Sequence, residues 1–220
     1  MSCPVTGLPE RWQVNPRHPT MPEVEGAATA ITAGQLIAIP TETYYALAVD
    51  VRCFRTLERL LKLKGRSSAD KPLLLLVSST SMARRHSATI PKGFEALAAA
   101  CWPGPLTLIV PAAATLPRAV VSVAGNVAMR VSPHPVAATL LRAVGAPITG
   151  TSANLAEEAP HREAGVLIDD LGLHIDGVLD GGPTKGGPAS TLLDLTADPA
   201  CILRSGAVDR QTIERALRSA

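Results

Sequence analysis

Short apolar runs alternate along this chain with longer amphipathic segments, and this alternation restricts the fold more than any other feature. Residues 36–39 are typical of a buried strand, which ends at Pro40 because proline has no N–H for a sheet. Leucines at 57, 60 and 61 have helical spacing, and Gly65 ends that helix. The same reasoning predicts strands at 73–77, 106–110, 127–131, 147–150, 177–179 and 191–195, and helices at 23–34, 80–86, 92–101, 134–143, 163–171 and 209–218.

Strands and helices that alternate at this spacing predict a single α/β domain, with helices packed on a twisted sheet of mixed parallel and antiparallel strands. A chain of 220 residues fits one such domain. We expect residues 1–22, which are rich in proline, to be a flexible N-terminal extension. Residues 23–208 would form the catalytic domain, and 209–220 a C-terminal helix. These patterns do not predict the strand order.

The net charge of the chain is too small to attract an anionic partner over a long distance. Lys and Arg exceed Asp and Glu by 21 − 19 = 2, too little to draw in nucleic acid or a membrane, so an anionic partner must meet a local cluster. The four cysteines form no C-x-x-C pair, and we expect buried free thiols rather than a zinc site or a disulfide framework. Apolar runs such as 73–77 are far too short to span a membrane, so we expect a cytoplasmic protein with no membrane partner.

The first candidate binding stretch begins where the strand at 36–39 ends. Residues 40–47 read Pro-Thr-Glu-Thr-Tyr-Tyr-Ala-Leu and hold two threonines, a carboxylate and two tyrosines. Ligands of α/β proteins bind at strand ends, where such groups act as donors and acceptors. Thr41 and Tyr45 are therefore candidate binding residues, although an ordinary polar turn capped by a tyrosine explains the same stretch.

A cluster of cations follows the second predicted helix. Lys62, Lys64, Arg66 and Lys71 lie close together in the sequence, with only Asp70 opposing them. Lysine supplies a point charge and arginine a planar fork, and both are used to hold phosphate. A solvated helix end is the alternative interpretation.

A third stretch, 149–154, reads Thr-Gly-Thr-Ser-Ala-Asn and suits an oxyanion or a ribose, although such residues more often form turns and helix caps. Arg130 and Arg204 each lie in an apolar run, where a buried arginine requires an ion-pair partner or a ligand. Ser190 opens a strand after a glycine-rich run. Neither common glycine motif for nucleotides is found, so these patterns alone predict only an anion-binding α/β domain.

Taken in order, these blocks resemble the YrdC/TsaC family of threonylcarbamoyl-AMP synthases over about residues 23–207. The resemblance rests on Pro40-Thr41-Glu42-Thr43, Lys64-Gly65-Arg66, Lys71-Pro72-Leu73, Trp102-Pro103-Gly104-Pro105-Leu106-Thr107, Arg130-Val131, Ser152-Ala153-Asn154, Ser190-Thr191 and Leu203-Arg204-Ser205-Gly206-Ala207. It implies a YrdC-like fold with an open basic cavity. It also implies a nucleotidyltransferase that converts L-threonine, bicarbonate and ATP into threonylcarbamoyl-adenylate and pyrophosphate, for the threonylcarbamoyladenosine (t6A) modification of tRNA. Longer relatives carry an extra C-terminal domain, for which 220 residues leave no room.

The resemblance also assigns a role to each matching residue. Lys64 and Arg66 would act in catalysis by holding the ATP phosphates, and the rest of the nucleotide would contact Ser152, Asn154 and Arg204. L-Threonine and its carboxylated form would be surrounded by Thr41, Tyr45, Lys71, Arg130, Thr151 and Ser190. Mg²⁺ would be carried by the triphosphate rather than by protein ligands. The expected partners are downstream threonylcarbamoyl-transferase proteins and RNA that contacts the basic cavity.

Some positions in these blocks depart from the family pattern. Ala46 and Ala48 replace glycines, Ser67 replaces a proline, and Ala156-Glu157 replaces Ser-Gly. Because these residues flank the predicted site, two alternatives stay open: an enzyme that forms another carbamoyl- or acyl-adenylate, and a non-catalytic module that binds RNA or a nucleotide. An RNA-binding module would need aromatic platforms for stacking, and the chain has few aromatic residues.

Overall fold

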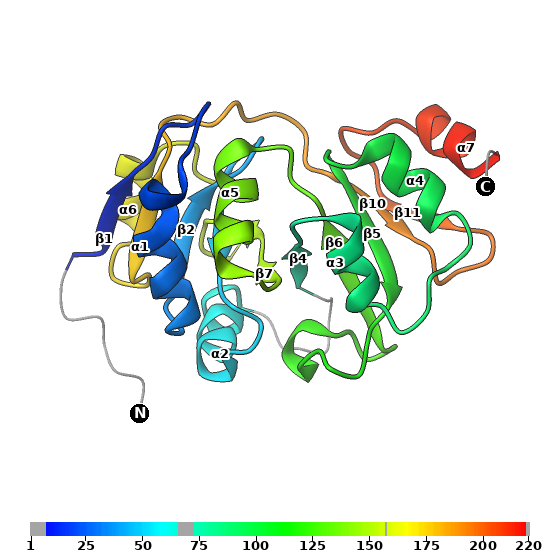
Figure 1. The fold of residues 1–220 in the computed structure, drawn as a ribbon, viewed down its shortest axis with the longest axis horizontal. Coiled ribbons are helices and arrows are strands. Elements are labelled where there is room, and N and C mark those ends of the chain that lie inside the picture. The colour runs from blue at the N-terminus through cyan, green and yellow to red at the C-terminus, as the bar shows by residue number, and fades with distance from the viewer. Residues whose placement is uncertain (1–7, 66–72, 157, 219–220) are drawn as a thin grey trace.

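The chain forms an α/β structure in which two mixed β-sheets lie side by side (Figure 1). The computed structural model describes residues 8–65, 73–156 and 158–218. In spatial order, one sheet contains β1 (Glu10–Gln13), β9 (Gly177–Asp180), β2 (Ile37–Pro40), β3 (Tyr45–Ala48) and β8 (Thr151–Ser152). The second contains β11 (Cys201–Arg204), β10 (Thr191–Asp194), β5 (Leu106–Pro111), β6 (Asn126–Arg130), β4 (Leu74–Leu76) and β7 (Ile148–Thr149). The predicted α/β class with mixed strand directions is confirmed, but the strands are divided between two sheets instead of one.

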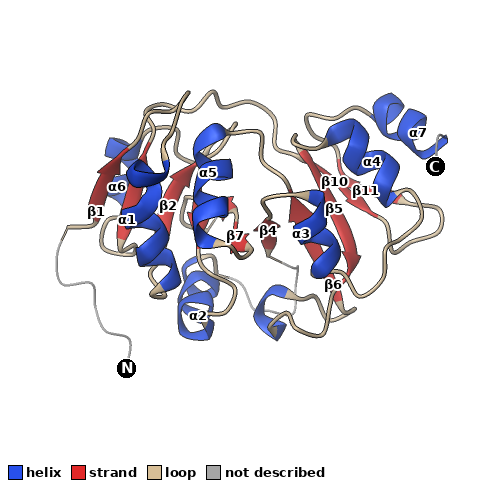
Figure 2. Ribbon diagram, in the orientation of Figure 1, coloured by secondary structure: helices blue, strands red, loops and turns tan. Residues whose placement is uncertain are grey.

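Helices cover these sheets (Figure 2). They are α1 (Met21–Thr32), α2 (Phe54–Leu63), α3 (Thr80–Arg85), α4 (Phe94–Cys101), α5 (Pro135–Val144), α6 (Ala164–Leu171) and α7 (Arg210–Arg218), with a short 3₁₀ helix at Arg118–Val120. α1 and α5 pack together on the first sheet, where Val24, Ile31 and Leu140 share one apolar core. α4 packs against α7 beside the second sheet. The one-sided burial of α1 follows from the helical spacing of its apolar residues.

The segment 148–152 crosses from one sheet to the other. β7 pairs with β4 of the second sheet, and β8 pairs with β3 of the first. Gly150 stands between them, and a Cβ at this position would lie 2.6 Å from Leu76 Cγ. Thr149 adds a link between the sheets, because its N–H donates to Val49 O at 2.9 Å. The close approach at Gly150 therefore lets one short segment serve as an edge strand in both sheets.

The N-terminal segment differs from the expected flexible extension at 1–22. Part of it forms β1, which pairs in parallel with β9, so the expectation is wrong for these residues. Trp12 fixes the strand, since its ring lies within 2.5 Å of where a Cβ on Gly177 would be. Arg11 Nε also donates to Asp180 Oδ2 at 2.9 Å. The strand has almost no buried residue and hence no apolar pattern that would have revealed it.

The other predicted elements agree with the structure to within two residues at each end. The short strands β3, β8 and β11 are absent from the prediction. The predicted C-terminal helix at 209–220 corresponds to α7, and its last two residues lie outside the described part of the chain.

Two smaller expectations can be compared with the structure. Within residues 8–65, 73–156 and 158–218, no helix combines the length and the apolar character needed to cross a bilayer. Cys53 and Cys101 are half-buried free thiols, whereas Cys201 is exposed, so the expectation of buried thiols is wrong for Cys201. The cysteine at position 3 lies outside the described residues.

Candidate active site

A cavity of about 560 Å³ is walled by strands of both sheets. Among the residues that line it are the predicted site residues Thr41, Tyr45, Arg130, Thr151, Ser152, Ser190 and Arg204. Lys64 and Asn154 contact Ser152 from behind this wall. Arg66 and Lys71 lie outside the described residues. The fold therefore brings together, around one space, residues that are far apart in the sequence.

Strands β5 and β6 of the second sheet form one wall of the cavity, because every second side chain of each strand faces it. Thr107 and Ile109 on β5, like Ala128 and Arg130 on β6, line the cavity. Met129, between the last two, belongs to the hydrophobic core. Successive side chains on a strand point to opposite faces of its sheet. Strand β6 thus packs one face into the core and places the guanidinium of Arg130 in the cavity wall with the other.

Lys64 holds the turn at 152–154, which begins at the end of β8. Its side chain is buried, and Nζ donates to Ser152 O at 3.1 Å and to Asn154 O and Oδ1, each at 2.8 Å. Ser152 Oγ donates to Asn154 Oδ1 at 2.6 Å, and Asn154 Nδ2 donates to Glu158 O at 2.6 Å. The ammonium group holds the turn from behind, while Thr151 and Ser152 line the cavity.

Arg130 is a buried cation with an unused donor. Its side chain is 5% exposed, and Nη1 forms an ion pair with Glu42 Oε1. The other carboxylate oxygen of Glu42 accepts a hydrogen bond from Ser132 Oγ at 2.7 Å. Burial lowers the pKa of Arg130 below its ordinary range, a shift that Glu42 opposes and Arg204 increases, but a guanidinium keeps its proton at any ordinary pH. Arg130 Nε is also buried and has no hydrogen-bond partner among the described residues.

Arg204 and Ser190 form a second polar group on the wall. Arg204 is exposed, and its Nη2 and Nε donate to Ser190 O at 2.9 and 3.2 Å. The buried hydroxyl of Ser190 shares a hydrogen bond of 2.8 Å with Thr107 Oγ1. A planar guanidinium held in this way has a defined orientation, which suits the recognition of an anionic or planar group.

The hydroxyl groups of Thr41 and Tyr45 are engaged within the protein. Thr41 Oγ1 donates to Tyr44 O at 2.6 Å, which closes the turn between β2 and β3. Tyr45 OH donates to Gly182 O at 2.9 Å and lies 3.3 Å from Asp180 Oδ1. Burial raises the pKa of Tyr45, and the charge of Asp180 raises it further. Tyr45 is therefore a neutral, fixed part of the wall and not a group that titrates near neutral pH.

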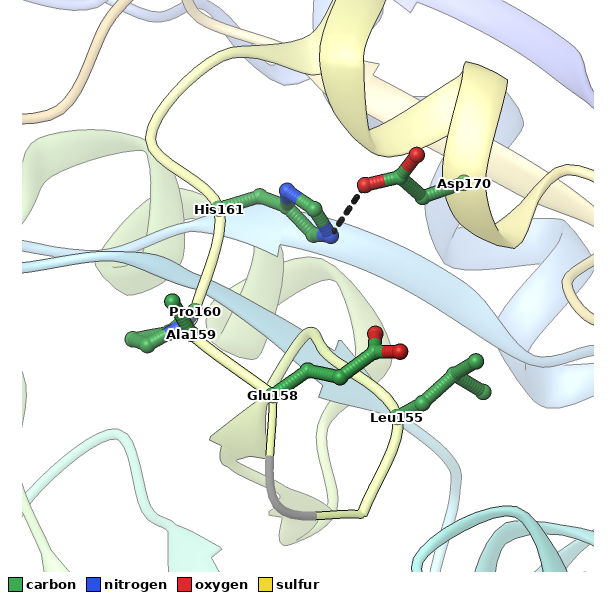
Figure 3. Close-up of a pocket in the computed structure, with 6 residues that line it drawn as sticks. All are labelled: Leu155, Glu158, Ala159, Pro160, His161 and Asp170. Carbon is green, nitrogen blue, oxygen red and sulfur yellow. Dashed lines mark ion pairs between the residues drawn. The ribbon is translucent and has the colours of Figure 1, made fainter.

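A second cavity, of about 440 Å³, shares Pro160 with the first. Figure 3 shows His161 pointing toward Asp170 of α6, with 3.3 Å between His161 Nε2 and Asp170 Oδ2. Glu158 extends from the same loop as His161. None of the predicted site residues lines this cavity, so it is not part of the candidate site.

The donors around the first cavity are hydroxyl groups and two guanidinium groups, a set that suits anions. In the part of the chain that the structure describes, no group of three or more His, Cys, Asp or Glu residues could hold a metal ion.

The sequence prediction omits several residues of this site, of which Glu42 and Thr107 contact predicted residues through polar groups. A signal for Glu42 existed, because a buried arginine in a strand needs a counter-charge and this carboxylate follows the buried strand at 36–39. Thr107 becomes recognisable once Leu106 and Leu108 are placed in the core, since alternation then puts Thr107 on the other face of β5.

Comparisons with known proteins agree with this architecture. The Sua5/YciO/YrdC family model, described as "Telomere recombination", matches residues 29–206. The chain is 35% identical over 191 residues to the threonylcarbamoyl-AMP synthase of Pyrococcus abyssi, a match that covers 87% of this chain and 56% of that protein. It is 40% identical over 165 residues to the threonylcarbamoyl-AMP synthase of Xanthomonas campestris pv. campestris, covering 74% of this chain and 88% of that protein. The chain thus spans little more than half the length of the first relative and most of the second.

Solved structures give the same result. The crystal structure of P. abyssi Sua5 complexed with L-threonine superposes with a TM-score of 0.87 at 32% identity, covering 94% of this chain and 60% of that one. E. coli YciO gives a TM-score of 0.85 at 24% identity, covering 94% of this chain and 100% of that one. At this lower identity the likeness to YciO concerns the fold alone.

Proposed function

Because this chain belongs to the Sua5/YciO/YrdC family, we propose that it is a threonylcarbamoyl-AMP synthase, which converts L-threonine, bicarbonate and ATP into threonylcarbamoyl-adenylate and pyrophosphate. One observation carries the proposal beyond family membership. Arg130, a buried guanidinium paired with Glu42, lines a cavity that otherwise presents hydroxyl groups, apolar groups and the guanidinium of Arg204. A donor of this kind fits a carboxylate or another oxyanion.

The proposed reaction has two bond-forming steps. The amino nitrogen of threonine attacks the carbon of bicarbonate, and loss of water leaves an N-carboxylated threonine. An oxygen of the new carboxylate then attacks the α-phosphorus of ATP, and the bond to pyrophosphate breaks. No side chain needs to become covalently bonded to a substrate. The protein instead holds anionic reactants in contact, which requires fixed positive charges and preorganised donors.

On the amino-acid side of the cavity, Arg130 would bind a carboxylate, and Thr151 and Ser190 would contact threonine and its carboxylated form. Thr41 and Tyr45 would form the wall around threonine without donating to it, because their hydroxyl groups already donate to acceptors within the protein. Lys71, which lies outside the described residues, completes the proposed set on this side.

On the nucleotide side, Ser152 and Asn154 would contact ATP from the turn that Lys64 holds, and Arg204 would cover the far end. Lys64 would add its positive charge behind the turn, and Arg66, outside the described residues, would hold the phosphates directly. Mg²⁺ would be bound through oxygens of the triphosphate, which this hard cation prefers as ligands. The adenylate would then pass to a transferase that modifies tRNA, with RNA contacting the basic cavity.

Release of pyrophosphate by the purified full chain tests the proposal. We expect release that requires ATP, bicarbonate and L-threonine together, with threonylcarbamoyl-adenylate identified by mass spectrometry. Arg130→Leu should abolish it, whereas Arg84→Leu, which removes a surface guanidinium paired with Glu95, should not. If L-threonine gives no bicarbonate-dependent pyrophosphate, the proposal fails.

The same assay with other amino acids addresses the alternative enzyme, which Ala46 in the cavity wall favours because the family pattern has glycine there. Release with an amino acid other than threonine would assign the chain to a related adenylate-forming reaction. Tight binding of ATP or RNA without release would assign it to the non-catalytic class.

A further inference from the structure

We propose that Glu42 is a positioning residue, which holds one edge of Arg130 and so fixes the guanidinium in the cavity wall for the carboxylate of the amino-acid substrate. The inference rests on the proposed function, since it takes the ligand of Arg130 to be an amino acid. Glu42 is not among the described residues that line the cavity, so it would act through Arg130 and not by touching substrate.

The ion pair joins the two sheets. Glu42 lies in the turn between β2 and β3 of the first sheet, whereas its partner lies on β6 of the second. The turn is fixed from within, because Thr41 Oγ1 donates to Tyr44 O at 2.6 Å. It is also fixed from outside, because Gly186 N–H donates to Thr43 O at 2.7 Å. The carboxylate therefore reaches across the sheet boundary from a rigid turn.

Both oxygens of the carboxylate are used. Oε1 of Glu42 pairs with Nη1 of Arg130, and Oε2 accepts the hydrogen of Ser132 Oγ at 2.7 Å. Two contacts fix the plane of the carboxylate, and a guanidinium is itself planar and rigid. Once Nη1 is held, the plane of the whole guanidinium is set as well. The part of Arg130 that lines the cavity thus has one orientation instead of several.

Charge also supports a carboxylate ligand at this position. The Arg130 side chain is 5% exposed and that of Glu42 16%, so each charge is largely removed from water. Glu42 compensates the charge of Arg130, and Arg204 adds a second positive charge to the same cavity wall, close enough to lower the pKa of Arg130 further. A substrate carboxylate would compensate this second charge.

The variant Glu42→Asp tests whether the position of the carboxylate matters as well as its charge. Aspartate keeps the negative charge but is shorter by one methylene, so it cannot reach both Arg130 and Ser132. We expect the dissociation constant for L-threonine, measured by titration calorimetry on the full chain, to rise on the order of tenfold, the equivalent of one charge-assisted hydrogen bond. The dissociation constant for ATP should change by less than about twofold, because groups that share no contacts affect one another only slightly. L-Threoninamide, which has no carboxylate, should lose far less affinity than L-threonine.

Two further variants control for folding. Glu95→Asp makes the same change in the surface pair with Arg84 and should leave both affinities unaltered. Ser132→Ala removes the hydrogen bond to the second oxygen of Glu42, so it should weaken L-threonine binding in the same direction but less. If Glu42→Asp does not fold, Ser132→Ala still provides the comparison between threonine and its amide.

An equal loss of affinity for threonine and threoninamide, or no loss in either variant, would overturn the positioning role. Failure of the proposed function looks different, because the unaltered protein would then fail to release pyrophosphate with threonine. If another amino acid supports release, the same comparison with that amino acid and its amide tests Glu42 independently of the identity of the substrate.

Discussion

Replacing Lys64 by methionine removes an ammonium group and keeps a side chain of similar length. In the structure this ammonium is buried and donates to two backbone carbonyls, Ser152 O and Asn154 O, and to Asn154 Oδ1. Methionine cannot donate to any of them. The substitution therefore releases the turn that carries Thr151 and Ser152 on the cavity wall.

The size of the effect follows from these contacts. A hydrogen bond to a charged group contributes about 1.5–3 kcal/mol, but the bonds of one ammonium do not add fully, and removing the charge also relieves its desolvation. Asn154 Oδ1 also keeps a donor, because Ser152 Oγ lies 2.6 Å away. We therefore expect the free energy of unfolding to fall by about 2–4 kcal/mol for Lys64→Met. In a domain of this size that corresponds to roughly 5–15 °C in the midpoint of thermal unfolding.

Chemical denaturation and ATP titration of the same sample measure the two consequences separately. Lys62→Met is the matched control, because Lys62 lies in the last turn of α2, two residues before Lys64, and is exposed. It should change the free energy of unfolding by less than about 0.5 kcal/mol. If Lys64→Met were as stable as Lys62→Met, the turn would not depend on the ammonium, and the reasoning would be refuted. A loss of ATP affinity without a loss of stability would instead indicate that Lys64 acts on the phosphates alone.

Two other predictions concern positions around the site. Gly150→Ala places a Cβ 2.6 Å from the fully buried Leu76 and should cost about 1–3 kcal/mol in unfolding free energy, whereas a neutral result would argue against close packing of the sheets there. Burial alone would raise the pKa of Asp180, but hydrogen bonds from a backbone N–H and from Arg11 outweigh it and lower the pKa. The stabilisation is thus present above the ordinary pKa of about 3.9 and is lost as the pH falls below it, so the stability difference between the unaltered protein and Arg11→Ala should shrink below about pH 4. A difference that grew toward acid would contradict this assignment.

Sequence patterns predicted the elements that carry many apolar residues. The strand at 106–110 and the helix at 134–143 were recognisable because their core-facing residues recur at the period of each structure. β8 and β11 have two and four residues and owe their place to neighbouring strands, so nothing local marks them. The division into two sheets also cannot be predicted from local sequence patterns, because it depends on which strands pair across long stretches of chain.

For the candidate site, residue types alone indicated an anion-binding cavity, and the resemblance to a family selected the positions. Seven of those positions line one cavity, yet their contacts could not be foreseen. Lys64 was expected to face phosphate from the end of a helix, and the structure instead places its ammonium against carbonyl oxygens of a turn. The sequence does not single out Glu42, because a carboxylate has no obvious use among anionic substrates until the structure shows its ion pair with Arg130.

The segment that crosses from one sheet to the other bears on how the molecule folds. β7 and β8 are the terminal strands of different sheets, and a single residue separates them in the chain. Because one residue links them, placing β7 against β4 also brings β8 close to β3, so the formation of the two sheets is coupled. Denaturation should then proceed as one cooperative transition, and a backbone break at this crossing would remove an edge from both sheets at once.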